Sequence, residues 1–136
     1  MKLVYAVQNV MTEDIITVDA DASLGDAMRT MVERGIGSVV VTRDGEIVGI
    51  LTERDVLKSV VADAQAAQRK AGEVMSGPVI TVDANAAIGQ AVDLMAEKKI
   101  RRLLVSQAGQ IRGIVTERDL MKATLDVFIK LRDAWI

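Results

Sequence analysis

The stretch Gly-Ile-Leu-Thr-Glu-Arg-Asp at residues 49–55 returns as Gly-Ile-Val-Thr-Glu-Arg-Asp at residues 113–119, a shift of 64 positions. Outward from this stretch, residues 10–58 align with residues 74–122 without a gap, and about 23 of the 49 paired positions are identical. Self-similarity at a fixed spacing is typical of a chain built from repeated structural units. We therefore expect two units of one fold, related by pseudo-twofold symmetry.

Each unit has strand and helix patterns in the order β-α-β-β-α, which predicts a mixed α/β (α+β) fold. In the first unit, Ser23 is a suitable helix N-cap with Asp26 three residues on. Residues Arg43-Asp44-Gly45 predict a hairpin turn, because glycine readily takes a positive φ. The predicted elements of this unit are a strand at 15–18, a helix at 24–34, strands at 38–42 and 46–51, and a helix after Thr52.

Apolar side chains at helical spacing predict the buried faces of the first helix in each unit. These residues are Leu24, Ala27, Met28, Met31 and Val32 in the first unit, and Ile88, Ala91, Val92 and Met95 in the second. Pro78 is expected to open the first strand of the second unit, where a missing N–H is tolerated. The repeat predicts a first motif at 8–64, a connector at 65–73, a second motif at 74–125 and a helical tail at 126–136.

The composition excludes several classes of function. The chain contains neither Cys nor His, which removes thiol nucleophiles, imidazole bases and the usual zinc ligands. It also has no EF-hand loop, so we expect no metal site. Because the chain has 17 basic and 19 acidic residues and three aromatic ones, we do not expect nucleic acid as a partner. The chain has no apolar run that could span a bilayer and no signal peptide, so we expect no membrane association and a cytoplasmic location.

The repeated Thr-Glu-Arg-Asp, at residues 52–55 and 116–119, has two interpretations. Thr followed by Asp three residues later at a helix start is typical of a capping box. A helix N-terminus is also a favourable anion site, and an Asp one turn into it can accept hydrogen bonds from both hydroxyls of a ribose. Both roles can coexist, because capping leaves one carboxylate oxygen of Asp55 or Asp119 available.

The whole repeat, from Val-Met-Thr at 10–12 to Thr-Glu-Arg-Asp-Leu at 116–120, resembles the CBS-domain family over about residues 8–125. The openings Val74-Met75-Ser76-Gly77-Pro78 and the runs Thr-Val-Asp-Ala at 17–20 and 81–84 fit that family. The resemblance implies a stand-alone tandem pair, also called a Bateman module. In such a module two motifs form two clefts, and each cleft can hold AMP, ADP or ATP as a regulatory ligand.

The resemblance also implies which residues bind the ligand. The family's ribose-binding Asp falls on Asp55 and Asp119, and its Ser/Thr on Thr52 and Thr116. A basic pair before the second strand often holds phosphates. Arg101-Arg102 stands there in the second motif, whereas Gly37-Ser38 stands there in the first. The favoured site comprises Ile80, Thr81, Val82, Ile100, Arg101, Arg102, Thr116, Arg118 and Asp119, and the weaker one comprises Ile16, Thr17, Val18, Ile36, Gly37, Ser38, Thr52, Arg54 and Asp55.

Each arginine in these sets has an ordinary alternative. Arg101 and Arg102 can be a solvated pair at a helix end, where the dipole favours positive charge. Arg54 and Arg118 can simply be exposed to solvent.

The favoured hypothesis is an energy-sensing regulatory module that binds an adenine nucleotide and acts on a separate partner protein. We expect no enzyme activity, since the sequence has no nucleophile–base pair at a spacing typical of a catalytic site. The alternatives are a scaffold or dimerisation module without a nucleotide, or a binder of another adenosyl ligand such as S-adenosylmethionine. CBS pairs commonly associate, and closed twofold dimers are frequent, so we also expect a homodimer.

Overall fold

The computed structural model describes residues 5–77 and 79–135 and divides the chain into two compact units. The first unit comprises Ile15–Val79. The second unit comprises the chain from Ile80 onward together with the N-terminal segment up to Asp14. Pro78, for which a strand start was expected, lies outside the described residues.

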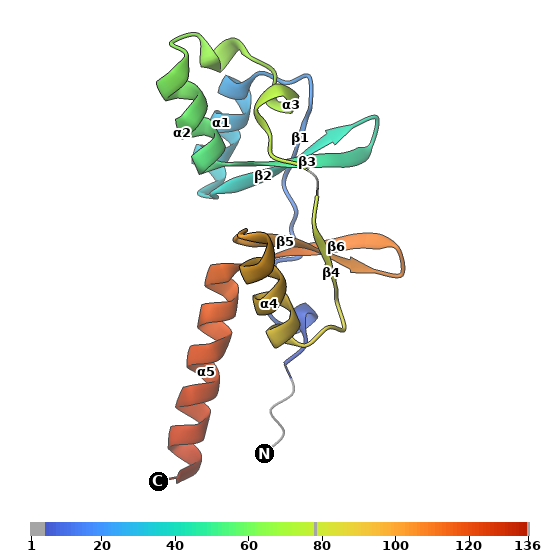
Figure 1. Cartoon of the computed structure of the whole chain (residues 1–136), viewed down its shortest axis with the longest axis vertical. Helices are drawn as coiled ribbons and strands as arrows, with labels where there is room; N and C mark the ends of the chain where they lie inside the picture. Colours follow the sequence, from blue (N-terminus) through green and yellow to red (C-terminus); the bar gives the residue numbers. More distant parts are fainter. Residues whose placement is uncertain (1–4, 78, 136) are drawn as a thin grey trace. The chain divides into compact units, whose positions relative to one another are not determined.

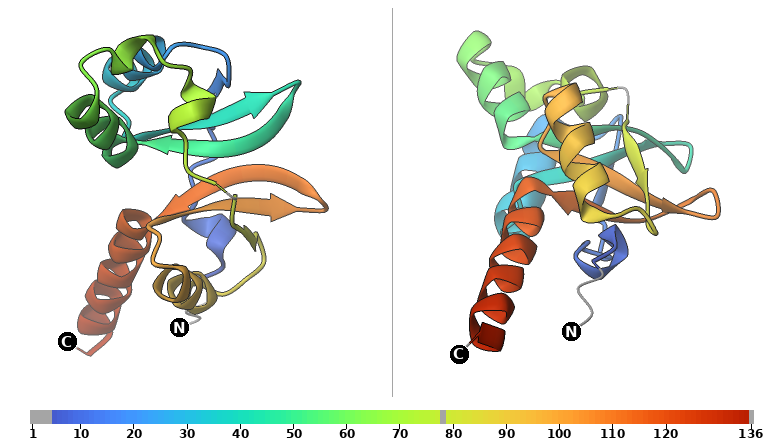
Figure 2. Two further views of the ribbon diagram at one scale, coloured as in Figure 1. Left: turned by 45° about the horizontal axis from the view of Figure 1, so that its top comes forward. Right: turned by 60° about the horizontal axis from the view of Figure 1, so that its bottom comes forward.

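The first unit has a three-stranded sheet in the order β1-β2-β3, with β1 parallel to β2 and β2 antiparallel to β3. Figures 1 and 2 show α1 and α2 on one face of this sheet. The β2–β3 turn is formed by Asp44 and Gly45, both with positive φ, as a tight hairpin requires. The elements are β1 (Thr17–Asp19), α1 (Leu24–Arg34), β2 (Ser38–Arg43), β3 (Glu46–Thr52), α2 (Glu53–Ala62) and α3 (Ala71–Val74).

The second unit repeats this arrangement with the sheet β4-β5-β6 and with α4 and α5 on one face (Figures 1 and 2). Its elements are β4 (Thr81–Asp83), α4 (Ile88–Lys98), β5 (Arg102–Gln107), β6 (Gln110–Thr116) and α5 (Glu117–Trp135). The predicted fold of two β-α-β-β-α units is confirmed. The expected tail is the second half of α5, up to Trp135.

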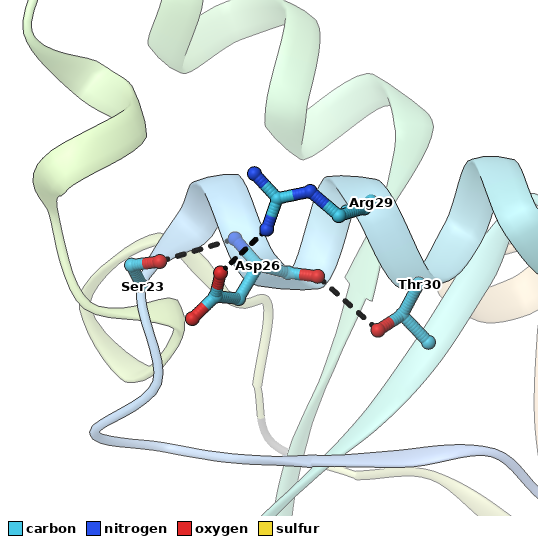
Figure 3. A network of polar contacts seen from close by, with 4 residues as sticks. All are labelled: Ser23, Asp26, Arg29 and Thr30. Atoms are coloured by element: carbon cyan, nitrogen blue, oxygen red, sulfur yellow. Dashed lines mark hydrogen bonds and ion pairs between the residues drawn. The ribbon is translucent and has the colours of Figure 1, made fainter.

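The start of α1 shows how local sequence sets an element boundary (Figure 3). The Ser23 hydroxyl accepts a hydrogen bond from the backbone N–H of Asp26 at 3.0 Å, which satisfies one free donor of the first turn. Asp26 in turn pairs with Arg29 at 2.8 Å, and the Thr30 hydroxyl donates to the Asp26 carbonyl. The helix ends at Gly35 in the left-handed conformation. The predicted helix at 24–34 is confirmed.

Each unit is completed by a short leading segment. One of these segments lies before β1 in the chain and the other lies before β4, and the two are equivalent under the 64-residue shift. In the second unit the Val7 N–H donates to the Ala86 carbonyl at 2.8 Å, and in the first unit the Ala71 N–H donates to the Ala22 carbonyl at 2.8 Å. Val7 and Ala71 are fully buried in their respective cores. The first unit therefore takes its leading segment from the predicted connector, and the second unit takes its own from the N-terminus. The compact units thus group the chain differently from the ranges inferred from the repeat.

The core of each unit lies between its sheet and its helices and is aliphatic. The buried side chains include Leu24, Met31, Val39, Val41 and Leu51 in the first unit, and Val82, Met95, Leu103, Val105 and Val115 in the second. Two residues of the predicted buried faces lie outside these cores, because Val32 is 80% exposed and Val92 is 45% exposed. Among the described residues, none of the helices combines the length and the apolar character that a bilayer span requires.

Candidate functional site

The repeated Thr-Glu-Arg-Asp lies at the junction of a strand and a helix in each unit. In the first unit Thr52 ends β3 and caps α2. Its hydroxyl accepts from the Asp55 N–H at 3.2 Å, and its own N–H donates to Asp55 Oδ2 at 2.9 Å. The Thr52 hydroxyl also donates to Asp55 Oδ2 at 2.9 Å. The predicted capping box is confirmed here.

The second unit forms the same junction between β6 and α5. The Thr116 N–H donates to Asp119 Oδ2 at 2.9 Å, and the Asp119 N–H donates to the Thr116 hydroxyl at 3.2 Å. Both helix starts therefore carry a half-buried carboxylate within the first turn, where the helix dipole favours negative charge. At Asp119, the second carboxylate oxygen, Oδ1, accepts no hydrogen bond from any of the described residues.

Strand pairing brings other predicted residues of the first site to the same edge. Ser38 lies opposite Thr52 in the β2–β3 ladder. The Glu53 N–H donates to the Gly37 carbonyl at 3.0 Å, and the Ile16 carbonyl accepts from the neighbouring strand. Ile16, which precedes β1, therefore lies with the start of β2 and the start of α2 at one edge of this sheet.

The second unit has the equivalent edge, with two arginines in it. Arg102 begins β5 opposite Thr116, and the Arg101 carbonyl accepts from the Glu117 N–H at 2.8 Å. Arg101 is 78% exposed and pairs with Glu117 at 3.8 Å, a separation and exposure that make the ion pair weak. Its guanidinium is therefore available to an anion at low energetic cost. The half-buried Arg102 lies beside the helix start.

The remaining predicted residues differ in what they present to this edge. Arg54 and Arg118 are exposed, as their ordinary interpretation holds, and Thr17 and Thr81 are also exposed. Val82 is 8% exposed and belongs to the core, so only its backbone can meet a ligand. The other apolar residues, Ile16, Val18, Ile36, Ile80 and Ile100, are half-buried and pack against the cores.

Ser76 is a site residue that sequence reasoning missed. Its hydroxyl donates to Asp55 Oδ1 at 2.7 Å, so both oxygens of that carboxylate are engaged. Ser76 belongs to the leading segment of the first unit, 21 residues from Asp55. The signal that could have found it is the repeat itself, since Ser76 aligns with Thr12 and each follows a methionine.

Each unit also has an apolar groove between its two longer helices. The groove of the second unit, about 560 Å³, lies between α4 and α5, and that of the first, about 450 Å³, lies between α1 and α2. Several lining residues are equivalent under the 64-residue shift. They include Met28, Met31, Ile36, Val56 and Leu57 in the first unit, and Val92, Met95, Ile100, Leu120 and Met121 in the second.

A second polar cluster lies away from the helix starts, between the N-terminal segment and α5. The Tyr5 hydroxyl donates to Asp126 Oδ2 at 2.8 Å and accepts from Lys130 Nζ at 2.7 Å. The bonds from Tyr5 and then from Lys130 lower the pKa of Asp126 below its ordinary value of 3.8. The contacts with Tyr5 and then with Asp126 raise the pKa of Lys130 above 10.5. This cluster anchors the leading segment of the second unit.

Comparison with known proteins gives close relatives along nearly the whole chain. The uncharacterized protein MK0525 of Methanopyrus kandleri is 38% identical over 120 residues, which are 86% of this chain and 61% of that protein. In another curated relative the match covers 32% of the length, so the chain spans about a third to three fifths of these two proteins.

Solved structures share the fold. The CBS-domain containing protein ATU1752 from Agrobacterium tumefaciens has a TM-score of 0.82 and 32% identity, covering 88% of this chain and 92% of its own. CBSX2, solved in complex with AMP, has a TM-score of 0.76 and 26% identity, covering 90% and 98%. The family model for the CBS domain matches residues 7–62 and 71–126. The chain therefore belongs to the CBS-domain family and carries two CBS domains in tandem.

Proposed function

We propose that this chain binds an adenine nucleotide at the helix starts and signals its presence to a separate partner protein. The observation that carries the proposal is the carboxylate of Asp119, which Thr116 holds through Oδ2, while Oδ1 accepts no hydrogen bond from the described residues. A carboxylate held in this way can accept hydrogen bonds from vicinal ribose hydroxyls. The AMP complex of CBSX2, a protein of the same fold, supports an adenosyl ligand.

The charge pattern assigns different ligand groups to different places. Asp119 is negative, so the phosphates belong away from it and the ribose belongs on it. Arg101 and Arg102 supply the positive charge at the neighbouring strand, and the planar guanidinium suits phosphate geometry. The equivalent positions in the first unit, Gly37 and Ser38, carry no charge. We expect the Asp119 site to hold AMP, ADP or ATP more tightly than the Asp55 site.

The proposed role is regulatory rather than catalytic. Binding would shift the populations of the module's conformations, and a partner that prefers one of them would respond. Energy sensing, the unidentified regulated partner and a cytoplasmic location remain predictions.

Association into a homodimer is part of the proposal. The groove between α4 and α5 is bordered by Leu125 and Phe128, which are 61% and 65% exposed, and Met121 adds to this surface. An exposed apolar surface of this kind marks an interaction site. A second copy presents the same surface, and self-complementary pairing gives a closed twofold dimer.

A scaffold without a nucleotide is the second candidate, because the capping boxes by themselves account for both Thr-Glu-Arg-Asp motifs. Titration of the purified protein with AMP, ADP, ATP and S-adenosylmethionine by calorimetry distinguishes the two. The proposal predicts saturable binding of at least one adenine nucleotide. Absence of binding to all four at millimolar concentration would favour the scaffold, and preference for S-adenosylmethionine would change the ligand class.

A further inference from the structure

We propose that Ser76 is a latch on the first site: its hydroxyl occupies the oxygen of Asp55 that a ribose would need. This inference rests on the proposed function and adds a reason for the inequality of the two sites that is independent of the arginines. It concerns contacts within the first unit alone.

The contact engages the whole carboxylate of Asp55. Oδ2 accepts from the N–H and the hydroxyl of Thr52, both at 2.9 Å, and Oδ1 accepts from the Ser76 hydroxyl at 2.7 Å. A bond of this length to an ionised carboxylate lies at the strong end of protein hydrogen bonds. A ribose can approach Asp55 in bidentate fashion only after the Ser76 hydroxyl turns away.

The backbone holds Ser76 in place for this contact. Its N–H donates to the Ile50 carbonyl at 2.9 Å, and its carbonyl accepts from the Ile50 N–H at 3.1 Å. Gly49, the residue before Ile50, permits the approach, since a Cβ there would lie 2.9 Å from the Ser76 carbonyl oxygen. The Ser76 hydroxyl can therefore rotate away from Asp55 while the Ser76 backbone stays in place.

The second unit has the same backbone arrangement without the latch. Thr12, the repeat equivalent of Ser76, exchanges hydrogen bonds with Ile114 at 2.8 and 2.9 Å. Within residues 5–77 and 79–135, however, the Thr12 side chain makes no hydrogen bond to Asp119. The hydrogen bonding of Oδ1 in the two carboxylates thus differs by one hydroxyl, in addition to the difference in arginines.

The amount by which the latch weakens ligand affinity at the first site follows from an exchange of hydrogen bonds. When a ribose displaces the latch, Asp55 gains a ribose hydroxyl, and the exposed Ser76 hydroxyl turns to water. The loss is close to one net hydrogen bond, which corresponds to roughly 3- to 10-fold in affinity. The latch therefore weakens the first site without closing it.

The test isolates the first site by disabling the second. Calorimetric titration with AMP compares Asp119→Ala with the double variant Asp119→Ala/Ser76→Ala. The matched control compares Asp55→Ala with Asp55→Ala/Thr12→Ala, which probes the other site at the equivalent position. Thermal unfolding by circular dichroism checks that all variants are folded, and Asp119→Asn replaces Asp119→Ala if the weakened helix cap prevents folding.

The latch predicts that removing Ser76 tightens AMP binding at the first site by roughly 3- to 10-fold, while removing Thr12 leaves the second site unchanged. Equal or weaker binding without Ser76 would overturn the latch, as would an equal gain in both pairs. If wild type binds AMP and the Asp119→Ala/Ser76→Ala variant does not, the inference of a latch is wrong, while the proposed function stands. Absence of AMP, ADP and ATP binding to wild type and all variants would contradict the proposed function itself, and the latch with it.

Discussion

Replacing Gly113 by alanine tests how the leading segment of the second unit docks on β6. A Cβ at Gly113 would lie 2.7 Å from the Thr12 carbonyl oxygen and 2.8 Å from Met11 Sδ. Both distances are well inside an ordinary non-bonded contact of about 3.5 Å. The methionine can move, but the carbonyl is held by the Ile114 N–H at 2.9 Å. Gly113→Ala must therefore displace backbone and strain this hydrogen-bonded pair.

We expect Gly113→Ala to lower the free energy of unfolding by about 1–3 kcal/mol, as overpacking of a buried position does. Urea unfolding followed by circular dichroism measures this change. Gly89→Ala is the matched control, because Gly89 lies in α4 and a Cβ there would meet no atom within 4 Å. That substitution should stabilise the protein by about 0.5–1 kcal/mol, since alanine is the better helix former.

The two substitutions are predicted to have opposite signs. If Gly113→Ala is as stable as wild type, or gains as much stability as Gly89→Ala, the leading segment does not lie against β6 and the prediction is wrong. A loss in both variants would instead indicate a general intolerance of glycine replacement.

Three further predictions concern the anchor, the charge pattern and the association surface. Tyr5→Phe removes the bonds to Asp126 and Lys130, so a carboxyl titration followed by NMR should show the Asp126 pKa rising toward 3.8. In wild type this cluster stabilises the fold near neutral pH. The contribution of Asp126 to folding stability is lost as the pH falls through its lowered pKa, and the contribution of Lys130 is lost as the pH rises through its raised pKa. Arg102→Ser should weaken ATP binding about 10-fold and leave adenosine binding unchanged, because the proposal places this guanidinium on the phosphates, which adenosine lacks. An equal effect on both ligands in calorimetry would place Arg102 elsewhere. Leu125→Glu, which puts charge on the exposed α5 surface, should convert a dimer to a monomer in light scattering, and an unchanged mass would exclude this surface.

The repeat explains why most of the fold could be predicted. The helix at 24–34 and the hairpin around Asp44-Gly45 depend on local signals, namely a cap, an apolar face and a turn residue. The 64-residue shift then carries each assignment to the second unit. The structure confirms these elements because local preference and long-range packing agree in them.

The leading segments could not be predicted in the same way. Val7 and Ala71 occupy equivalent core positions, yet one follows the N-terminal residues and the other follows an alanine-rich connector. Their placement depends on hydrogen bonds to the β1–α1 and β4–α4 loops, and no local pattern encodes such contacts. The exposure of Val32 has a similar cause, because helical periodicity does not reveal which part of an apolar face another helix covers.

The functional groups of the candidate site could be predicted from the sequence, but the hydrogen bonds that each carboxylate already accepts could not. The Thr-Glu-Arg-Asp motif predicted a carboxylate one turn into each helix, and the capping bonds place Asp55 and Asp119 there. Ser76, which is brought to Asp55 by pairing with Ile50, adds a difference between them to that of the arginines. Two nearly identical sequence motifs therefore differ through a residue outside both of them.

The proposed function requires that the helix-start carboxylates bind an adenine nucleotide and that the two sites bind it with unequal affinity. The most direct measurement is calorimetric titration of wild type, Asp119→Ala and Asp55→Ala with AMP and ATP. Loss of a charge-assisted hydrogen bond to the ribose should weaken binding by about 1.5–3 kcal/mol, or roughly 10- to 150-fold. We predict this loss for Asp119→Ala and a much smaller one for Asp55→Ala. Equal affinities in all three proteins, or no binding in any, would contradict the proposed function and leave both carboxylates as helix caps.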